Sequence, residues 1–270
     1  MPSGLRARVV TALLLAAAVI VILFWLPPGV AVLAVMVVVA AGAWEWAGLA
    51  GLPATGARIG YTVAVGAATA LAWGLTENVE ARIAFLWLSA GWWLAALAWL
   101  VVAPGRGGPR IAILAGFLVL VPAAVALGRL VKLEPGGQSL LLFLLVLIAA
   151  ADVGAYFGGR RFGRRKLAPR VSPGKTLEGF IAGLVAAGLA AAAGAWLLGF
   201  PALPWLVLCL LVALVSVVGD LSESMFKRRA GLKDSGALLP GHGGILDRLD
   251  SVSAAGPVFL LGLHLLGIAG

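Results

Sequence analysis

The chain has 270 residues, of which 62% are hydrophobic and 11% charged, with a formal net charge of +9 and a mean hydropathy of +1.08. Soluble domains are about 45–50% apolar and about 25% charged, and a soluble globule with this surplus would expose apolar patches large enough to aggregate. The composition excludes a soluble enzyme and a disordered chain, the single Cys209 excludes an internal disulfide framework, and a polytopic membrane protein remains.

Nine mostly apolar runs are interpreted as transmembrane helices, since a bilayer core about 30 Å thick needs around 20 apolar residues per helix. They lie near Val9–Leu26, Gly29–Ala47, Ile59–Leu75, Ile83–Ala103, Ile111–Leu127, Ser139–Tyr156, Leu177–Phe200, Pro204–Val218 and Val252–Ile268. No alternation typical of strands competes, so the sequence predicts helices throughout and an all-α fold. The first run is predicted to be a retained signal anchor, because Leu26-Pro27-Pro28 is no small-residue cleavage site.

Nine spans place the loops alternately on the two sides of the membrane, and the basic residues divide unequally between those sides. One side holds 17 of the 20 Lys and Arg residues, and the other holds Arg82, Arg129 and Lys132. Basic loops face the cytoplasm, so we expect a cytoplasmic N-terminus and a C-terminus outside. Topology thus accounts for the net charge, and no nucleic-acid partner is predicted.

All five aspartates lie at or beyond helix ends on the basic side: Asp152, Asp220, Asp234, Asp247 and Asp250.

Glu45 lies between two tryptophans at the predicted end of the second span and has two interpretations. It either completes a polar site on the basic side or belongs to a helix end whose tryptophans are interfacial anchors, the commoner role of such residues. His264, near the outer end of the last span, is predicted to pack or to lie at the interface. Cys209 is predicted to be a small buried apolar residue in mid-span.

Residues 152–179 form the first of two polar segments. Asp152 lies inside an apolar run, where an ionised group costs at least ~2.5–3.5 kcal/mol at the bilayer centre and less near the interface, so a partner is expected. Gly174-Lys175-Thr176 is similar to the end of a P-loop, but Pro169 occupies the first glycine position and no strand is predicted before it. We expect Lys175 to bind phosphate on a short turn into the seventh span. The arginines from Arg160 to Arg170 are attributed to topology and to anionic headgroups.

Residues 219–251 form the second polar segment, which begins with a polar stripe. Asp220, Glu223, Ser224 and Lys227 stand at i, i+3, i+4 and i+7, and on a helix these positions share one face. Carboxylates, a hydroxyl and an ammonium group suit a site for phosphate and a hard divalent cation. An ordinary solvated helix end with an acid–base pair has the same pattern, so both interpretations stay open.

Two glycines, Gly243 and Gly244, precede the last predicted helix. They allow close backbone approach and leave free N–H groups at a helix start, which is a ready anion site. Asp247 and Asp250 follow at i and i+3, and Mg²⁺ is commonly held by one or two carboxylates together with substrate phosphates. Alternatively, Asp247 caps the helix and Asp250 pairs with Lys233 or Arg248.

The residues of these segments combine into a longer pattern. It reads Ser224-x-Phe226-Lys227-Arg228, then after four residues Lys233-Asp234-x-Gly236, then Leu239-Pro240-x-His242-Gly243-Gly244-Ile245-x-Asp247-Arg248-Leu249-Asp250. This pattern resembles the signature of the CDP-diacylglycerol synthases, also called phosphatidate cytidylyltransferases. The resemblance covers roughly the C-terminal half and extends to Gly219–Ser224, Asp152-x-Gly154-Ala155-Tyr156 and Ser172-Pro173-x-Lys175-Thr176-x-Glu178-Gly179. The chain departs from the family pattern at two positions. It has Val153 where the family has a small hydroxyl residue, and Gly174 where a second lysine is common.

The resemblance implies that the phosphate of phosphatidic acid attacks the α-phosphorus of CTP, giving CDP-diacylglycerol and pyrophosphate. It implies an integral protein of a bacterial-type plasma (inner) membrane, with its site facing the cytoplasm, and dependence on Mg²⁺. A single membrane domain is expected, with residues 1–138 as a scaffold and residues 139–270 as catalytic helices with cytoplasmic loops at 158–176 and 219–251. Membrane lipids would be partners. The sequence does not give the oligomeric state and leaves a homodimer open, since twofold dimers are the commonest assembly.

The resemblance also implies residue roles. Asp220 and Asp247 would hold one or two divalent cations. The implied catalytic residues are Asp220, Ser224, Lys227, Asp247, Arg248 and Asp250. The implied substrate-binding residues are Asp152, Tyr156, Ser172, Lys175, Thr176, Arg228, Lys233, Asp234, His242, Gly243 and Gly244.

Two other functions would explain some of the same features. A CDP-alcohol phosphotransferase also uses aspartates and Mg²⁺ at a membrane face, but Asp247 and Asp250 are three residues apart where its pattern has four. A transporter of an anionic metabolite would explain the spans and the basic loops. It would also place polar groups near the bilayer midplane, whereas here they gather at one face.

Overall fold

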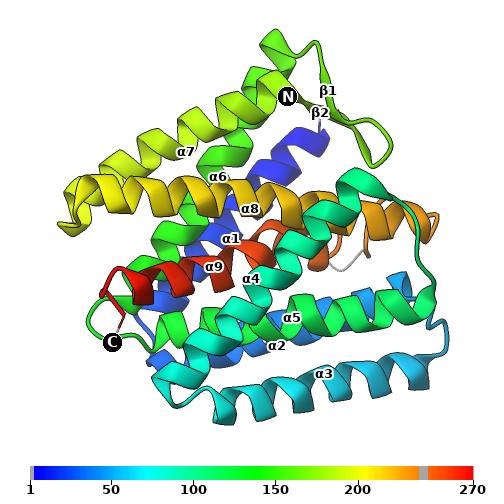
Figure 1. Ribbon diagram of the computed structural model, residues 1–270, viewed down its shortest axis with the longest axis horizontal. Coiled ribbons are helices and arrows are strands. Elements are labelled where there is room, and N and C mark those ends of the chain that lie inside the picture. The colour runs from blue at the N-terminus through cyan, green and yellow to red at the C-terminus, as the bar shows by residue number, and fades with distance from the viewer. Residues whose placement is uncertain (1–2, 237–242, 270) are drawn as a thin grey trace.

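The computed structural model describes residues 3–236 and 243–269, with side chains from Leu13 onward. Within that part it contains nine helices and one two-stranded hairpin (Figure 1). The elements are α1 (Ser3–Phe24), α2 (Pro28–Leu49), α3 (Thr55–Leu75), α4 (Val79–Val102), α5 (Pro109–Val131), α6 (Gly137–Phe162), β1 (Lys166–Ala168), β2 (Ser172–Thr176), α7 (Leu177–Leu198), α8 (Ala202–Arg229) and α9 (Leu246–Leu265). The predicted helical class is confirmed, because helices make up most of the described chain.

The prediction of helices throughout is wrong between α6 and α7, where β1 and β2 form an antiparallel hairpin. The two strands have only three and five residues, which is too short for an alternation to be recognised in the sequence. The Glu178 carboxylate closes the hairpin against α7, since it accepts hydrogen bonds from the backbone N–H groups of Arg164 at 2.9 Å and Arg165 at 3.1 Å. Lys175 therefore lies on a strand, and the expected short turn into the seventh span is corrected.

Six helices in the described part of the chain are long and apolar enough to cross a membrane: α2, α4, α5, α6, α7 and α8. Each coincides with one of the nine predicted spans. The other three predicted spans correspond to α1, α3 and α9, which do not meet the same criterion within the described residues. Large apolar side chains lie on the outer surface, as on Leu88, Val102 and Trp196, which are 75–83% exposed. An apolar surface of this kind suits a lipid environment.

Several helices extend past their predicted spans, and this places the polar residues on regular structure. α8 continues through Arg229 rather than stopping at Val218, and α9 begins at Leu246 rather than Val252. The predicted stripe on α8 and the two aspartates of α9 therefore project from helices, with fixed directions.

Helices α6 and α7 pack closely because small residues face each other along their crossing. A Cβ atom added to Gly158 would lie 2.2 Å from the Cβ atom of Ala182, and one added to Gly179 would lie 2.8 Å from the carbonyl oxygen of Ala155. Small residues at such spacing let backbones approach, a common device between membrane helices. This packing presents the hairpin and the adjoining C-terminal half of α6 to α8.

The buried apolar residues form two clusters that α5, α8 and α9 share. One cluster joins α1, α6 and α7 to the ends of α8 and α9 that contain Trp205 and Phe259. The other joins α2, α3 and α5 to the opposite ends of α8 and α9, which contain Phe226 and Leu246. Cys209 is fully buried and His264 packs against the carbonyl oxygen of Ala269 at 2.7 Å, so both predictions for these residues are confirmed.

Candidate active site

The polar stripe on α8 is buried against α9. Glu223 and Lys227 are 2% and 9% exposed, so the interpretation as a solvated helix end is wrong. The Lys227 ammonium group lies 3.1 Å from Glu223 Oε2 and 2.6 Å from Asp247 Oδ1. Burying charges without partners is costly, and this lysine compensates carboxylates from both helices. The stripe thus links the penultimate helix to the last one.

Asp247, in the first turn of α9, is held by several donors at once. Besides Lys227, the backbone N–H of Ser235 donates to its Oδ2 at 3.1 Å and the backbone N–H of Gly244 at 2.8 Å. The residue precedes the apolar run that begins at Val252. Burial acts to raise the pKa of its carboxyl group, but the hydrogen bonds and the Lys227 charge outweigh burial and lower that pKa. Asp247 is therefore held as a carboxylate. The N–H of Gly244, expected to face a substrate anion, faces this carboxylate.

The two polar segments meet where β2 reaches α8. The Lys175 ammonium group lies 2.5 Å from Asp220 Oδ2, across 45 positions of sequence. Ser224 Oγ donates to the other oxygen of Asp220 at 3.3 Å. Asp220 is therefore the residue through which the hairpin and the α8–α9 region form one site.

Asp250 lies one turn after Asp247, half-buried, and its carboxylate accepts a hydrogen bond from the N–H of Ser251 at 2.7 Å. Burial, together with the negative charges of Asp220 and Glu223, raises the pKa of Asp250 well above its ordinary value. The negative charges of Asp220 and Glu223 thus disfavour ionisation of Asp250, an effect that a bound cation would offset.

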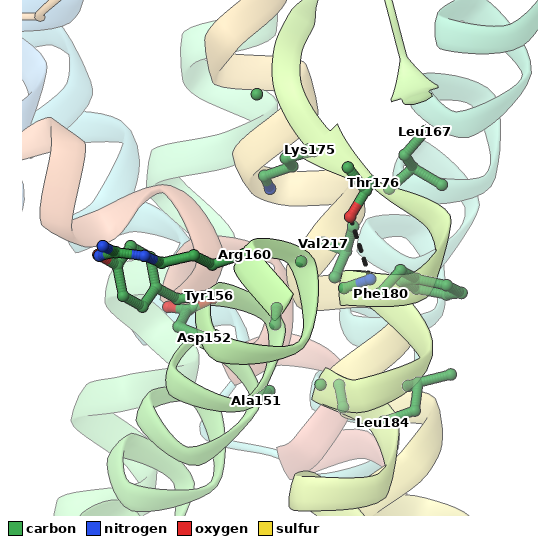
Figure 2. Close-up of a pocket in the computed structure, with 16 residues that line it drawn as sticks. Ala151, Asp152, Tyr156, Arg160, Leu167, Lys175, Thr176, Phe180, Leu184 and Val217 are labelled. Carbon is green, nitrogen blue, oxygen red and sulfur yellow. Dashed lines mark hydrogen bonds between the residues drawn. The ribbon is translucent and has the colours of Figure 1, made fainter. Parts of the chain in front are cut away.

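A pocket of about 410 Å³ opens beside Lys175, between α6, α7, α8 and the hairpin. Four predicted substrate-binding residues line it: Asp152, Tyr156, Lys175 and Thr176. Figure 2 shows Lys175 and Thr176 at the hairpin end of the pocket and Ala151 and Leu184 at the opposite end. The pocket is therefore polar at one end and apolar at the other.

Arg160 also lines this pocket, although topology and attraction to anionic headgroups were expected to account for it. Its guanidinium group donates to the hydroxyl of Tyr156 at 3.1 Å, one turn earlier on α6. The i,i+4 spacing of Arg160 and Tyr156 was the feature of the sequence that could have indicated this contact.

Thr176 caps α7, because its Oγ1 accepts a hydrogen bond from the N–H of Gly179 at 3.1 Å.

The remaining predicted site residues lie outside these contacts. Ser172 is half-buried on β2 and is not part of the pocket lining, and Arg228, Lys233 and Asp234 are exposed. Arg248 is exposed on α9 and interacts electrostatically with Asp152. His242 lies outside the described residues.

Glu45, Glu223 and Ser235 contact the residues of this site, although the family resemblance gave none of them a role. Glu45 comes from α2 and contacts Ser235 and Leu246. Its position between two tryptophans was a weak signal. Glu223 could have been recognised from its place in the polar stripe. No feature of the sequence pointed to Ser235.

The chemistry of the donor set fits Mg²⁺, a hard cation that prefers oxygen ligands. Asp220, Glu223, Asp247 and Asp250 supply carboxyl oxygens from α8 and α9 beside Lys175 and Lys227, and Glu223 Oε1 is buried with no hydrogen-bond partner in the described residues. No group of three or more His, Cys, Asp or Glu residues is arranged around a common point in residues 3–236 and 243–269. One or two carboxylates suffice when substrate phosphates supply further ligands.

Comparison with known proteins adds a family assignment. The model of the family described as "Cytidylyltransferase family" matches residues 6–266. The chain is 43% identical over 262 residues to the phosphatidate cytidylyltransferase of Pseudomonas aeruginosa, covering 94% of this chain and 95% of that protein. It is 39% identical over 281 residues to the enzyme of the same name from Haemophilus influenzae, covering 94% and 97%. A third relative of that name, from Helicobacter pylori, is 47% identical over 131 residues, covering 48% and 47%.

Proposed function

The chain belongs to the cytidylyltransferase family, and from this membership and its site we infer that it transfers the cytidylyl group of CTP to phosphatidate. A phosphate oxygen of the lipid forms a bond to the α-phosphorus of CTP, the bond from that phosphorus to the β-phosphate oxygen breaks, and pyrophosphate leaves. The product is CDP-diacylglycerol, a precursor in phospholipid synthesis. The observation that carries the assignment within the structure is the Lys175–Asp220 contact, which joins the two polar segments into one site.

The lipid phosphate is assigned to the hairpin end of the pocket, near Lys175 and Arg160. Both are cations that line a cavity whose other end is apolar, next to Ala151 and Leu184. A molecule with a phosphate group and acyl chains matches this polarity. The assignment is supported by the pocket opening beside helices that are apolar enough to lie in a membrane.

Charge neutralisation and in-line positioning are the main tasks of this site, because two polyanions must come together. The attacking phosphate oxygen is already ionised near neutral pH, so no general base is required. Lys175 and Lys227 would exchange part of their contact with Asp220 and Asp247 for contact with phosphate oxygens. Asp220 and Asp247 would hold Mg²⁺, which when bound neutralises triphosphate charge. Arg248 and the hydroxyl of Ser224 would orient the phosphates.

The membrane topology is a further part of the proposal: nine spans, a cytoplasmic N-terminus, an outer C-terminus and a site at the cytoplasmic face of a bacterial inner membrane. The distribution of 17 basic residues against three supports it. In Figure 1 the start of α1 and the hairpin lie at the top of the view and the C-terminus at the lower left, as such a topology requires. The variants Arg170→Cys and Lys132→Cys, each in a Cys209→Ala background and labelled with an impermeant maleimide, test this topology.

A homodimer stays a prediction, which light scattering of the purified protein tests.

The activity is tested with purified protein, phosphatidate, CTP labelled in the cytosine ring and Mg²⁺, following label into the lipid phase. Lipid-soluble label that needs both substrates supports the function, and pyrophosphate should appear in equal amount. If demonstrably folded protein produces no lipid-soluble label, and vesicles containing it take up an anionic metabolite, the transporter is the better assignment.

A further inference from the structure

Glu45 lies at the end of α2, far from the catalytic segments in the sequence, yet its side chain is 3% exposed and lies against the loop before α9. Its Oε2 atom accepts a hydrogen bond from the hydroxyl of Ser235 at 2.9 Å and another from the backbone N–H of Leu246 at 2.8 Å. Ser235 lies within the connection between α8 and α9, and Leu246 is the first residue of α9. One carboxylate oxygen thus ties that connection to the start of α9.

The end of α2 is itself firmly anchored, so that Glu45 starts from a fixed backbone. The indole N–H of Trp46 donates to the carbonyl oxygen of Ala112 on α5 at 2.8 Å. The ring of Trp46 packs against that of Phe226 on α8, with 5.1 Å between centroids. The helix that holds Glu45 is therefore locked to α5 and to the end of the polar stripe by neighbouring contacts.

The loop is shaped to receive this carboxylate. A Cβ atom added to Gly236 would lie 2.3 Å from Glu45 Oε1, and one added to Gly244 would lie 2.3 Å from Glu45 Oε2. Glycine at both positions lets the backbone lie directly against the carboxylate, and a side chain at either position would displace the carboxylate from this place. The fit involves both halves of the loop and is specific to the position of Glu45.

Of the two residues held by Glu45, one contacts the Asp247 carboxylate and the other precedes Asp247 in the chain. Ser235 contacts Glu45 through its hydroxyl and Asp247 through its backbone N–H, at 3.1 Å. Leu246 is the residue next to Asp247, and its N–H is fixed by Glu45. We propose that Glu45 is a positioning residue, which acts through Ser235 and Leu246 to set the direction of the Asp247 carboxylate.

The inference rests on the proposed function, because it assigns Glu45 a part in the same reaction. It predicts that turnover depends on Glu45 while binding in the lipid pocket does not, since the pocket is lined by α6, α7, α8 and the hairpin. Glu45→Leu, which has no acceptor, should lower kcat about 100-fold, the size of effect that misplacement of a catalytic group by about 1 Å produces. The KM for phosphatidate should stay within about threefold, a smaller change than the loss of one hydrogen bond commonly causes.

Two conservative variants separate positioning from simple packing. Glu45→Gln keeps a carbonyl oxygen as acceptor and should retain kcat within about threefold, whereas Ser235→Ala removes one of two hydrogen bonds and should lower kcat about fivefold. In the Glu45→Leu background, Ser235→Ala should have no further effect, because its partner is already gone. Non-additivity of this kind is not expected from two independent packing defects.

Hydrogen–deuterium exchange in detergent supplies a readout that does not depend on turnover. In Glu45→Leu, peptides containing Ser235 and Leu246 should exchange faster than in the parent protein, while peptides from the hairpin should be unchanged. Glu80→Gln, an exposed residue at the start of α4, is the matched control and should change neither rate nor exchange.

The outcomes distinguish this inference from the proposed function. If the parent protein forms no lipid product, the function is wrong. If the parent is active and Glu45→Leu keeps wild-type kcat and exchange, the positioning role is wrong. If Glu45→Leu does not fold, the decision falls to Ser235→Ala, and wild-type kcat in that variant would overturn the role.

Discussion

The two lysine–carboxylate pairs of the site differ in their distance from solvent. The side chains of Lys175 and Asp220 are 29% and 24% exposed, whereas those of Lys227 and Asp247 are 11% and 10% exposed. The first pair lies beside the open pocket and has few other contacts. The second pair has Glu223 and two backbone donors around it. An exposed pair is worth little in stability and can exchange partners readily, whereas a buried pair is costly to break. We therefore expect Lys175 to exchange its carboxylate partner for a substrate phosphate, and Lys227 to hold the carboxylates around it in place before substrate binds.

The largest expected effect concerns the two aspartates, one from each pair. Asp220→Asn and Asp247→Asn should each lower turnover by about 10³-fold, at the upper end of what one electrostatic contact to a transition state supplies. Removal of divalent cations with EDTA should abolish the activity of the parent protein, and added Mg²⁺ should restore it. The labelled-CTP assay measures both. Near-normal turnover in either variant would contradict its role in holding the cation, and Glu80→Gln serves as the control.

The comparison of the pairs is tested most directly on the stability of the folded protein. Lys227→Met leaves Glu223 and Asp247 buried without their cation, so it should lower the free energy of unfolding by about 3–5 kcal/mol. Lys175→Met should change that free energy by no more than about 1 kcal/mol, while lowering turnover about 100-fold. Thermal unfolding in detergent and the lipid assay measure the two effects. Equal destabilisation by both substitutions would contradict the contrast drawn here. Lys166→Met, at an exposed position of the neighbouring strand, is the control for charge.

The apolar end of the pocket can be narrowed without touching either pair. Leu184→Trp introduces a larger side chain at this end of the pocket lining, and we expect kcat/KM for long-chain phosphatidate to fall about tenfold, comparable to the loss of one or two methylene contacts. Leu189→Trp on the same helix is the control, because Leu189 faces outward and is 69% exposed. If both variants behave alike, the lipid does not occupy this end of the pocket.

The smallest effect is expected at Arg160. Arg160→Gln should raise the KM for phosphatidate about fivefold and leave kcat unchanged, as for the loss of one hydrogen bond to a phosphate at a partly exposed position. Arg161→Gln removes the same charge from the neighbouring position, which does not line the pocket, and should change KM little. An equal increase in both variants would indicate general attraction of anionic lipid rather than a specific contact.

Much of the polar site could be predicted from sequence because its residues follow helical spacing. Asp220, Glu223, Ser224 and Lys227 had to share a face of any helix, and α8 continues through all of them. The hairpin could not be predicted in this way, since its strands have only three and five residues, and the longer one contains proline and glycine, so that no period can be recognised. For the same reason, the position of Lys175 could be associated with phosphate but not with Asp220.

What the sequence determined by itself is the membrane character, the helical class and the identity of the polar segments, because these depend on composition and on spacing within single elements. What only the tertiary structure decided is which charges are partners. Lys175 meets Asp220 over 45 positions of sequence, and Glu45 meets Leu246 over 201. Such contacts depend on how helices pack against one another. A local sequence pattern contains no information on the distance in space between two helices that are far apart along the chain.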